Sequence, residues 1–276
     1  MFIRTEKSIR DFLHFYPIVS TLIIVNIALY LIVYVIPLPA IELLNQCTFG
    51  FRSGTLGEQI YACGMGFNPA ISHGEYWRLV TPIFLHGNYL THVLFNSFSL
   101  VLFGPALEQM LGKFKFIILY FVAGIIGNIG TFLVDPGMLN PHIGASGAIY
   151  GIFGLYLFMV VFRKHLMDYA STRIVIIILV IGLVMTFIRP GINISAHIFG
   201  FIGGFATGPL ILNNVQPFSP WRNQPRHRNS DDNPHFNPNR WKRRRVRMNP
   251  EVIKKIIWTV IGILIAAGVL SAMGII

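Results

Sequence analysis

Long apolar stretches dominate the chain and alternate with short polar segments. A helix rises about 1.5 Å per residue, so about 20 apolar residues cross a hydrocarbon core of about 30 Å. Runs of this length joined by short loops predict packed hairpins of transmembrane helices with no soluble domain between them. The expected fold is therefore an all-α polytopic membrane protein. The pattern predicts seven spans, at about 18–36, 89–111, 115–134, 146–162, 173–189, 195–212 and 256–276.

Two connections between these spans are longer than the rest. The first, about 37–88, has Gly-containing and aromatic stretches and is expected to pack onto the membrane surface. The second, about 213–255, is rich in Asn, Pro and Arg with few apolar residues, which is typical of a disordered linker. The predicted organisation is an N-terminal segment, a six-helix core, a basic linker and a seventh transmembrane helix: 1–17, 18–212, 213–255 and 256–276.

Composition agrees with a bilayer as the solvent, since 54% of residues are hydrophobic and only 12% are charged, against about a quarter charged in soluble domains. The net charge of +11 would suggest nucleic acid in a soluble protein, but the distribution of charge explains it more simply. Of the 22 Lys and Arg residues, all but Arg52, Arg78 and Arg189 lie in the N-terminal segment, alternate loops or the linker. Basic loops stay in the cytoplasm. We therefore expect a multi-pass protein of a bacterial plasma membrane, with a cytoplasmic N-terminus, an outer C-terminus and no nucleic-acid partner.

The Arg-rich run at Trp241–Arg247 has two interpretations. The favoured one is a signal that fixes the topology of the last helix. The alternative is binding of anionic lipid headgroups, at roughly 1 kcal/mol per basic residue near the surface.

The cysteines and the candidate metal ligands of the sequence indicate no particular chemistry. Cys47 and Cys63 lie in the same long loop and form either one disulfide or two free thiols, depending on the redox state of the space they face. No His-Glu-x-x-His or Cys/His cluster is present, and no metal is expected. No pair of membrane-embedded aspartates suggests an aspartyl mechanism.

Polar residues on three different spans are predicted to meet at one depth. His92 and Asn96 begin the second span, Ser146 opens the fourth and His197 begins the sixth. The alternating directions of the spans place all four in the outer leaflet, where polar groups are costly and usually functional. A serine becomes a nucleophile when a neutral histidine lies within hydrogen-bond reach. The pattern predicts a Ser146–His197 dyad.

Small residues explain how the two helices could approach closely. Gly147 and Gly151 on the fourth span, and Gly200 and Gly204 on the sixth, form small-xxx-small faces. Tyr150 follows Ser146 by one turn and shares its face, so its ring is expected to pack against the histidine.

Acyl transfer also needs donors for the developing oxyanion. The backbone N–H of Ser146, at a helix N-terminus, is one candidate, and the side chains of His92 and Asn96 are two more. The nearest acidic residue by leaflet, Asp135, sits in an Asp-Pro-Gly turn, so a dyad is predicted rather than a triad. Glu108, at the opposite end of its span, is interpreted as structural.

These residues resemble the rhomboid family of intramembrane serine proteases over roughly residues 18–212. The matching motifs occur in the family's order and on the expected spans. They are Trp77-Arg78, His92-x3-Asn96, Gly144-Ala145-Ser146-Gly147, and Ala196-His197 followed by Gly200 and Gly204.

The resemblance implies a six-helix core, here with a seventh span added, and a water-filled cavity open to the outer face. It also implies a Ser146–His197 dyad and an oxyanion site built from the Ser146 N–H, His92 and Asn96.

For the remaining residues it implies that Tyr150 stacks on the catalytic histidine and that Trp77 and Arg78 fix the outer loop against the core. Substrates would be membrane proteins with helix-breaking or small residues near the outer end of a transmembrane segment, and no cofactor is expected. The alternative from another class is an inactive relative that binds and routes client helices. A transporter ranks last, because no inverted repeat is visible.

Overall fold

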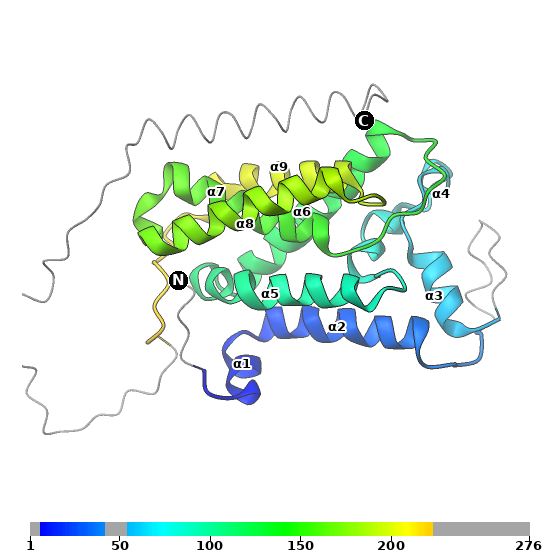
Figure 1. Cartoon of the computed structure of the whole chain (residues 1–276), viewed down its shortest axis with the longest axis horizontal. Helices are drawn as coiled ribbons and strands as arrows, with labels where there is room; N and C mark the ends of the chain where they lie inside the picture. The colour runs from blue at the N-terminus through cyan, green and yellow to red at the C-terminus, as the bar shows by residue number, and fades with distance from the viewer. Residues whose placement is uncertain (1–5, 42–53, 223–276) are drawn as a thin grey trace, which may run out of the picture. The chain divides into compact units, whose positions relative to one another are not determined.

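The computed structural model describes residues 6–41 and 54–222. All regular structure in these residues is helical (Figure 1). The elements are α1 (Ile9–Phe15), α2 (Pro17–Tyr34), α3 (Leu56–Gly64), α4 (Asn68–Ser72), η2 (Tyr76–Leu79), η3 (Thr81–Phe84), α5 (Leu90–Leu111), α6 (Lys113–Val134), α7 (Ser146–Phe162), η4 (Lys164–Leu166), α8 (Tyr169–Ile188) and α9 (Ile194–Ile211).

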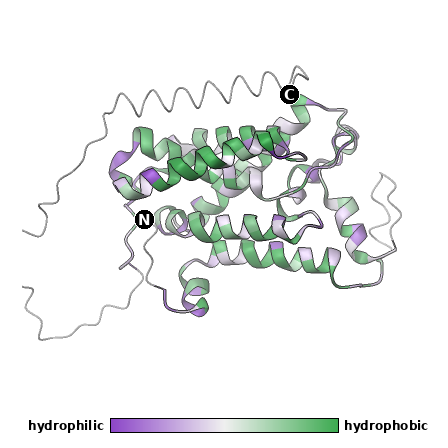
Figure 2. Cartoon of the chain, in the orientation of Figure 1, coloured by the Kyte–Doolittle hydropathy of each residue, from purple (hydrophilic) through white to green (hydrophobic). Residues whose placement is uncertain are grey.

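Five of these helices, α2, α5, α6, α8 and α9, are long and apolar enough to cross a membrane. Figure 2 shows hydrophobic colour along the long helices and hydrophilic colour mainly at their ends and connections. The prediction of an all-α polytopic membrane protein is therefore confirmed. The predicted seventh span, 256–276, and most of the predicted linker lie outside the described residues.

Helix α7 is shorter, at 17 residues, and is more enclosed than the five longer helices. It packs against α5, α6, α8 and α9, and every residue from Gly147 to Val160 is buried. A helix enclosed in this way meets protein on all sides, so its length need not match the hydrocarbon thickness. Its bounds coincide with the predicted span 146–162.

The other predicted boundaries shift by a few residues for local reasons. Helix α8 begins four residues earlier than expected because the Asp168 carboxylate accepts a hydrogen bond from the Ser171 N–H and caps it. Helix α6 begins at Lys113, directly after Gly112, whose φ of 79° ends α5. Helix α2 begins with Pro17, which suits the first turn of a helix.

Glycines bring α7 and α9 into backbone contact. A Cβ on Gly200 would lie 2.8 Å from the carbonyl carbon of Gly147, closer than two non-bonded carbons can approach. Gly204 meets the backbone of Gly151 in the same way. The start of α9 is thereby held directly against the start of α7.

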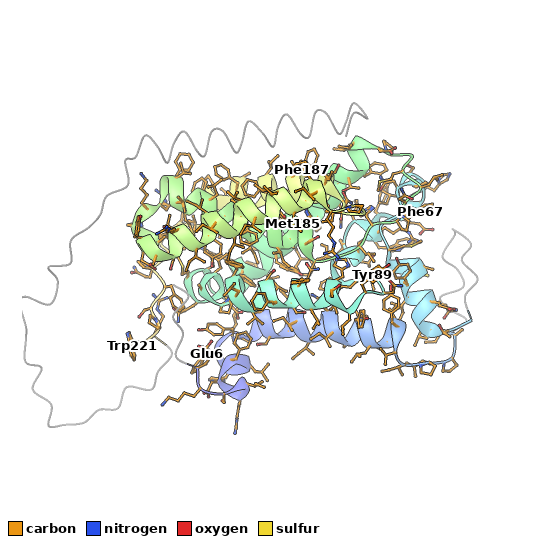
Figure 3. The ribbon with its side chains drawn as sticks, viewed as in Figure 1. Glu6, Phe67, Tyr89, Met185, Phe187 and Trp221 are labelled. Atoms are coloured by element: carbon orange, nitrogen blue, oxygen red, sulfur yellow. The ribbon has the colours of Figure 1, made fainter. Side chains whose placement is uncertain are left out.

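Helix α8 is packed much more loosely. Only 28% of its apolar window is buried, and side chains such as Ile181, Val184 and Met185 are exposed. Figure 3 labels Met185 and Phe187 on this helix. An uncovered apolar surface of this kind suits contact with lipid.

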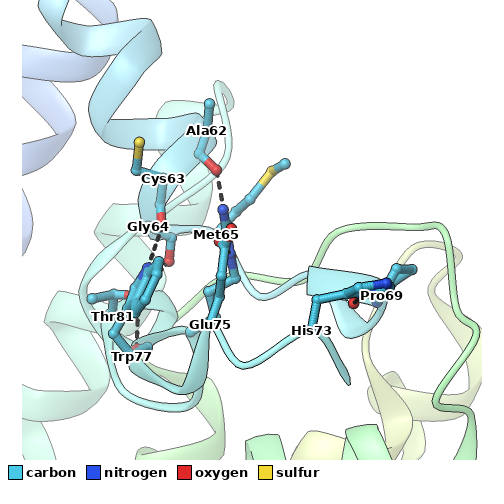
Figure 4. Close-up of polar contacts among 10 residues, drawn as sticks. Ala62, Cys63, Gly64, Met65, Pro69, His73, Glu75, Trp77 and Thr81 are labelled. Atoms are coloured by element: carbon cyan, nitrogen blue, oxygen red, sulfur yellow. Dashed lines mark hydrogen bonds and ion pairs between the residues drawn. The ribbon is translucent and has the colours of Figure 1, made fainter. Parts of the chain in front are cut away.

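The described residues 54–88 of the first long connection fold around the buried side chain of Arg78. This guanidinium is 1% exposed and donates to the Glu75 carboxylate at 2.6 Å and to the carbonyls of Ala62 and Met65, each at 2.8 Å. The Trp77 indole N–H donates to the Cys63 carbonyl at 3.1 Å (Figure 4). A buried charge is tolerated only when it is paired in this way, so Trp77 and Arg78 tie η2 to the end of α3. Cys63 itself is disulfide-bonded, and Cys47, the other cysteine of the sequence, lies outside the described residues.

At the opposite end of the core, the buried Glu108 carboxylate accepts hydrogen bonds from the N–H groups of Ile18 and Val19, at 2.9 and 2.8 Å. These groups belong to the first turn of α2, where a helix leaves its N–H groups unpaired. Glu108 thus attaches α2 to α5, as expected of a structural residue.

Candidate active site

The loop before α7 fixes where Ser146 begins the helix. Gly144 has a φ of 126°, a conformation that residues with a side chain rarely adopt, and its N–H donates to the Pro82 carbonyl at 2.9 Å. The loop is therefore tied to η3. Ala145, the N-cap residue of α7, forms no side-chain hydrogen bond to the helix. The start of α7 accordingly offers N–H groups without a side-chain cap, where the helix dipole favours negative charge.

Ser146 and His197 lie within hydrogen-bond distance. The Ser146 Oγ is 2.8 Å from the His197 Nε2, although the two residues belong to different helices. His197 is buried in the first turn of α9, which Asn193 caps by accepting from the Ala196 N–H at 2.9 Å. The N-cap of α9 and the glycine contact with α7 together set the position of the imidazole.

Tyr150 covers the face of the imidazole. Its ring centroid lies 4.1 Å from that of His197, with an angle of 15° between the planes, so the two rings are stacked. The Tyr150 hydroxyl donates to the Gly182 carbonyl at 2.6 Å and is also 2.6 Å from the Thr186 Oγ1. The ring that packs on His197 is thus anchored to α8.

His92 lies beside the serine loop. Its Nδ1 accepts a hydrogen bond from the Gly87 N–H at 3.2 Å, so the neutral ring carries its proton on Nε2. A Cβ on Gly144 would be only 2.9 Å from that Nε2 and 3.6 Å from the Ser146 Oγ. The His92 Nε2 and the Ser146 Oγ therefore both lie close to Gly144.

The Asn96 side chain is hydrogen-bonded to its own helix. It is buried one turn further along α5, and its amide donates to the His92 carbonyl at 2.9 Å. One amide proton of Asn96 is therefore engaged with its own helix, and the other is available as a donor.

Two loop histidines near this end of the core are held neutral. Burial, together with the neighbouring His92 imidazole, lowers the pKa of His86 to about 3. The His86 ring packs edge-on against His92, with centroids 5.1 Å apart. Burial lowers the pKa of His142 to about 4. At neutral pH neither ring adds positive charge near the serine.

The described residues contain no group of three His, Cys, Asp or Glu side chains placed to hold a metal ion.

Sequence reasoning missed one residue that contacts this cluster. The Thr186 Oγ1, on α8, lies 2.9 Å from the His197 Nδ1. A signal was present, because Gly182-x3-Thr186 is a polar residue one turn after a glycine within an otherwise apolar span. Its depth, near the end of the fifth predicted span, matches that of His197.

A membrane-spanning helical fold that brings a serine at a helix N-terminus to a buried histidine defines the class: a polytopic membrane protein with a Ser–His pair at one end of its helices. A family model described as "Rhomboid domain" matches residues 73–214, about half of the chain. Together with the relatives below, this match shows that the chain belongs to the rhomboid family.

One relative is "Putative rhomboid protease YdcA" of Bacillus subtilis (strain 168), 42% identical over 205 residues, which cover 74% of this chain and 93% of that protein. "Rhomboid protease GluP" of the same organism is 41% identical over 149 residues, which are 54% of this chain and 28% of that protein. "RHOMBOID-like protein 5" of Arabidopsis thaliana is 34% identical over 143 residues, which are 51% of this chain and 46% of that protein. The matched region spans less than half of the length of the last two. These relatives support an intramembrane protease function for this multi-pass membrane protein.

Proposed function

We propose that this protein is an intramembrane serine endopeptidase that cleaves transmembrane segments of other membrane proteins, with Ser146 as nucleophile and His197 as general base. The observation that carries the proposal is the 2.8 Å approach of the Ser146 Oγ to the His197 Nε2, beneath the stacked Tyr150 ring. A serine at this distance from an unprotonated imidazole nitrogen can transfer its proton as it attacks a carbonyl.

In the first half of the reaction, the Ser146 Oγ attacks the peptide carbonyl carbon while its proton passes to the His197 Nε2. The carbonyl oxygen becomes an oxyanion, which accepts hydrogen bonds from the Ser146 backbone N–H, the His92 Nε2–H and the free amide proton of Asn96. The C–N bond then breaks, and the imidazolium gives its proton to the leaving amine.

In the second half, a water molecule gives a proton to the His197 Nε2 and attacks the acyl ester. Collapse of this second tetrahedral intermediate returns the proton to the Ser146 Oγ and releases the new carboxyl terminus. His197 must be neutral at the start of each half.

The topology that accompanies this proposal is a six-helix protease core, 18–212, followed by a basic cytoplasmic linker, 213–255, and a seventh transmembrane helix, 256–276. The distribution of Lys and Arg supports a cytoplasmic N-terminus and an outer C-terminus. Cleavage then occurs near the outer face. The basic run of the linker fixes the topology of the last helix, and contact with anionic lipid headgroups is its alternative role.

The test is labelling of the purified full-length protein in detergent with a fluorophosphonate probe and, in a separate unlabelled sample, incubation of the protein in liposomes with model transmembrane substrates. We expect labelling and cleavage by the wild type, and neither by Ser146→Ala or His197→Ala. Thermal melts of all three proteins establish that they are folded. Equal labelling of wild type and Ser146→Ala would remove Ser146 as nucleophile, and a folded wild type without either activity would favour a client-binding role.

A further inference from the structure

One buried hydroxyl of helix α8, that of Thr186, lies in the candidate site. Thr186 is 1% exposed, on a helix whose other side chains near it are largely uncovered. Its Oγ1 lies 2.9 Å from the His197 Nδ1, 2.6 Å from the Tyr150 hydroxyl and 2.9 Å from the Gly182 carbonyl oxygen. Three hydrogen-bonding groups from three helices thus converge on one oxygen.

The protons of this cluster can be assigned from what each group is able to do. If Nε2 is to accept the Ser146 proton, the neutral His197 ring carries its own proton on Nδ1, and the Thr186 Oγ1 is the acceptor within reach. The Gly182 carbonyl only accepts and takes the Thr186 proton, while the Tyr150 proton goes either to Gly182 or to the remaining lone pair of the Thr186 Oγ1. Every donor is then paired, and Nε2 is left free for the serine.

The other tautomer satisfies the cluster less well. With the proton on Nε2, the Thr186 proton would turn to Nδ1, and Gly182 would keep only the hydrogen bond from Tyr150. The cluster then contains one hydrogen bond fewer, and Nε2 can no longer accept from Ser146.

We propose that Thr186 is a positioning residue for His197, which holds Nδ1 through its Oγ1 and so keeps Nε2 directed at Ser146. The proposal rests on the function proposed above. Stacking on Tyr150 fixes the plane of the imidazole but is compatible with a ring flipped by about 180° about χ2, and the hydrogen bond at Nδ1 distinguishes the two orientations. Thr186 thereby makes the geometry of the dyad depend on where α8 lies.

The experiment compares hydroxyl and non-hydroxyl side chains of similar size at this position. Thr186→Val keeps the shape and removes the oxygen, whereas Thr186→Ser keeps the oxygen. Thr207→Val on α9 is a matched control, because the Thr207 hydroxyl also donates to a glycine carbonyl of its own helix, Gly204, at 2.7 Å. The readout is the rate of fluorophosphonate labelling of purified full-length protein at several probe concentrations, with a thermal melt of each variant.

We expect Thr186→Val to lower the maximal labelling rate by about tenfold to a hundredfold, without changing the probe concentration that gives half of that rate. Thr186→Ser should stay within about threefold of the wild type, as should Thr207→Val. If Thr186→Val does not fold, Thr186→Cys replaces it with the same expectation, because sulfur is a weak acceptor.

Two results would overturn the positioning role while leaving the proposed function intact. One is a Thr186→Val rate equal to that of Thr207→Val, and the other is a Thr186→Ser rate as low as that of Thr186→Val. A folded wild type that does not label, or a Ser146→Ala protein that labels like wild type, would instead refute the proposed function and this inference with it.

Discussion

A single methyl group at Gly200 should separate the two residues of the proposed dyad. A Cβ there would lie 2.8 Å from the carbonyl carbon and 3.1 Å from the Cα of Gly147, and closer still to its carbonyl oxygen. Non-bonded carbons prefer about 3.5 Å or more, so α9 must move away from α7 by roughly 0.7–1 Å. Gly200 lies one turn after His197 and Gly147 directly follows Ser146, so the displacement falls at the dyad.

The expected consequence is a large loss of activity with a small loss of stability. Adding the displacement to the 2.8 Å between the Ser146 Oγ and His197 Nε2 gives about 3.5–3.8 Å, beyond a useful hydrogen bond. A misplacement of about 1 Å can lower a rate by about 100-fold. Overpacking costs about 1–3 kcal/mol, and replacing glycine by alanine in a helix returns up to about 1 kcal/mol, so the Gly200→Ala protein should remain folded.

The assay is the initial rate of fluorophosphonate labelling, set beside a thermal melt in the same detergent. Gly203→Ala is the control on the same helix, because the three atoms nearest to its Cβ would all belong to the side chain of Ile126 on α6, at 3.0–3.1 Å, and would have to move by only a few tenths of an ångström. We expect about 100-fold slower labelling for Gly200→Ala and less than about threefold for the control. Equal rates for the two variants would show that the glycine contact does not set the dyad distance.

Three further predictions concern other parts of the core. Asn96→Ala should slow cleavage by no more than about 100-fold, because one oxyanion donor is lost while the nucleophile remains; an unchanged rate would exclude Asn96 from the oxyanion site. Glu108→Gln should leave one N–H at the start of α2 without its acceptor and lower the free energy of unfolding by about 1–3 kcal/mol, visible as a melting temperature several degrees lower, with the labelling rate of the folded protein retained. A melt identical to that of the wild type would contradict this role. Burial gives His142 a pKa of about 4 in the folded protein, against 6.5 in the unfolded chain. Above pH 6.5 the ring is neutral in both states, and as the pH falls towards 4 protonation of the unfolded chain lowers the free energy of unfolding by up to roughly 3 kcal/mol. His142→Phe should flatten the fall in melting temperature between pH 7.5 and 4.5, and equal slopes for the two proteins would disprove it.

The sequence by itself determined the class of fold and which polar residues lie at the same end of the core. Apolar runs longer than about 18 residues have few alternatives to spanning a bilayer, because backbone N–H and C=O groups must be paired inside hydrocarbon. Helix α7 was bounded correctly from hydropathy alone, since Arg163 directly follows its last residue. The alternating directions of the spans then sufficed to bring Ser146 and His197 to the same end of the core.

Only the tertiary structure decided which side chains touch. Helices α7 and α9 are apolar on most of their surface, so no amphipathic pattern reveals which face of one meets which face of the other. The rotation of each helix about its axis follows instead from packing, here from the glycine contact that brings the Ser146 Oγ to 2.8 Å from the His197 Nε2. The same packing turned Thr186 of α8 towards the Nδ1 of His197, a contact between two helices that span patterns place at similar depth but cannot orient.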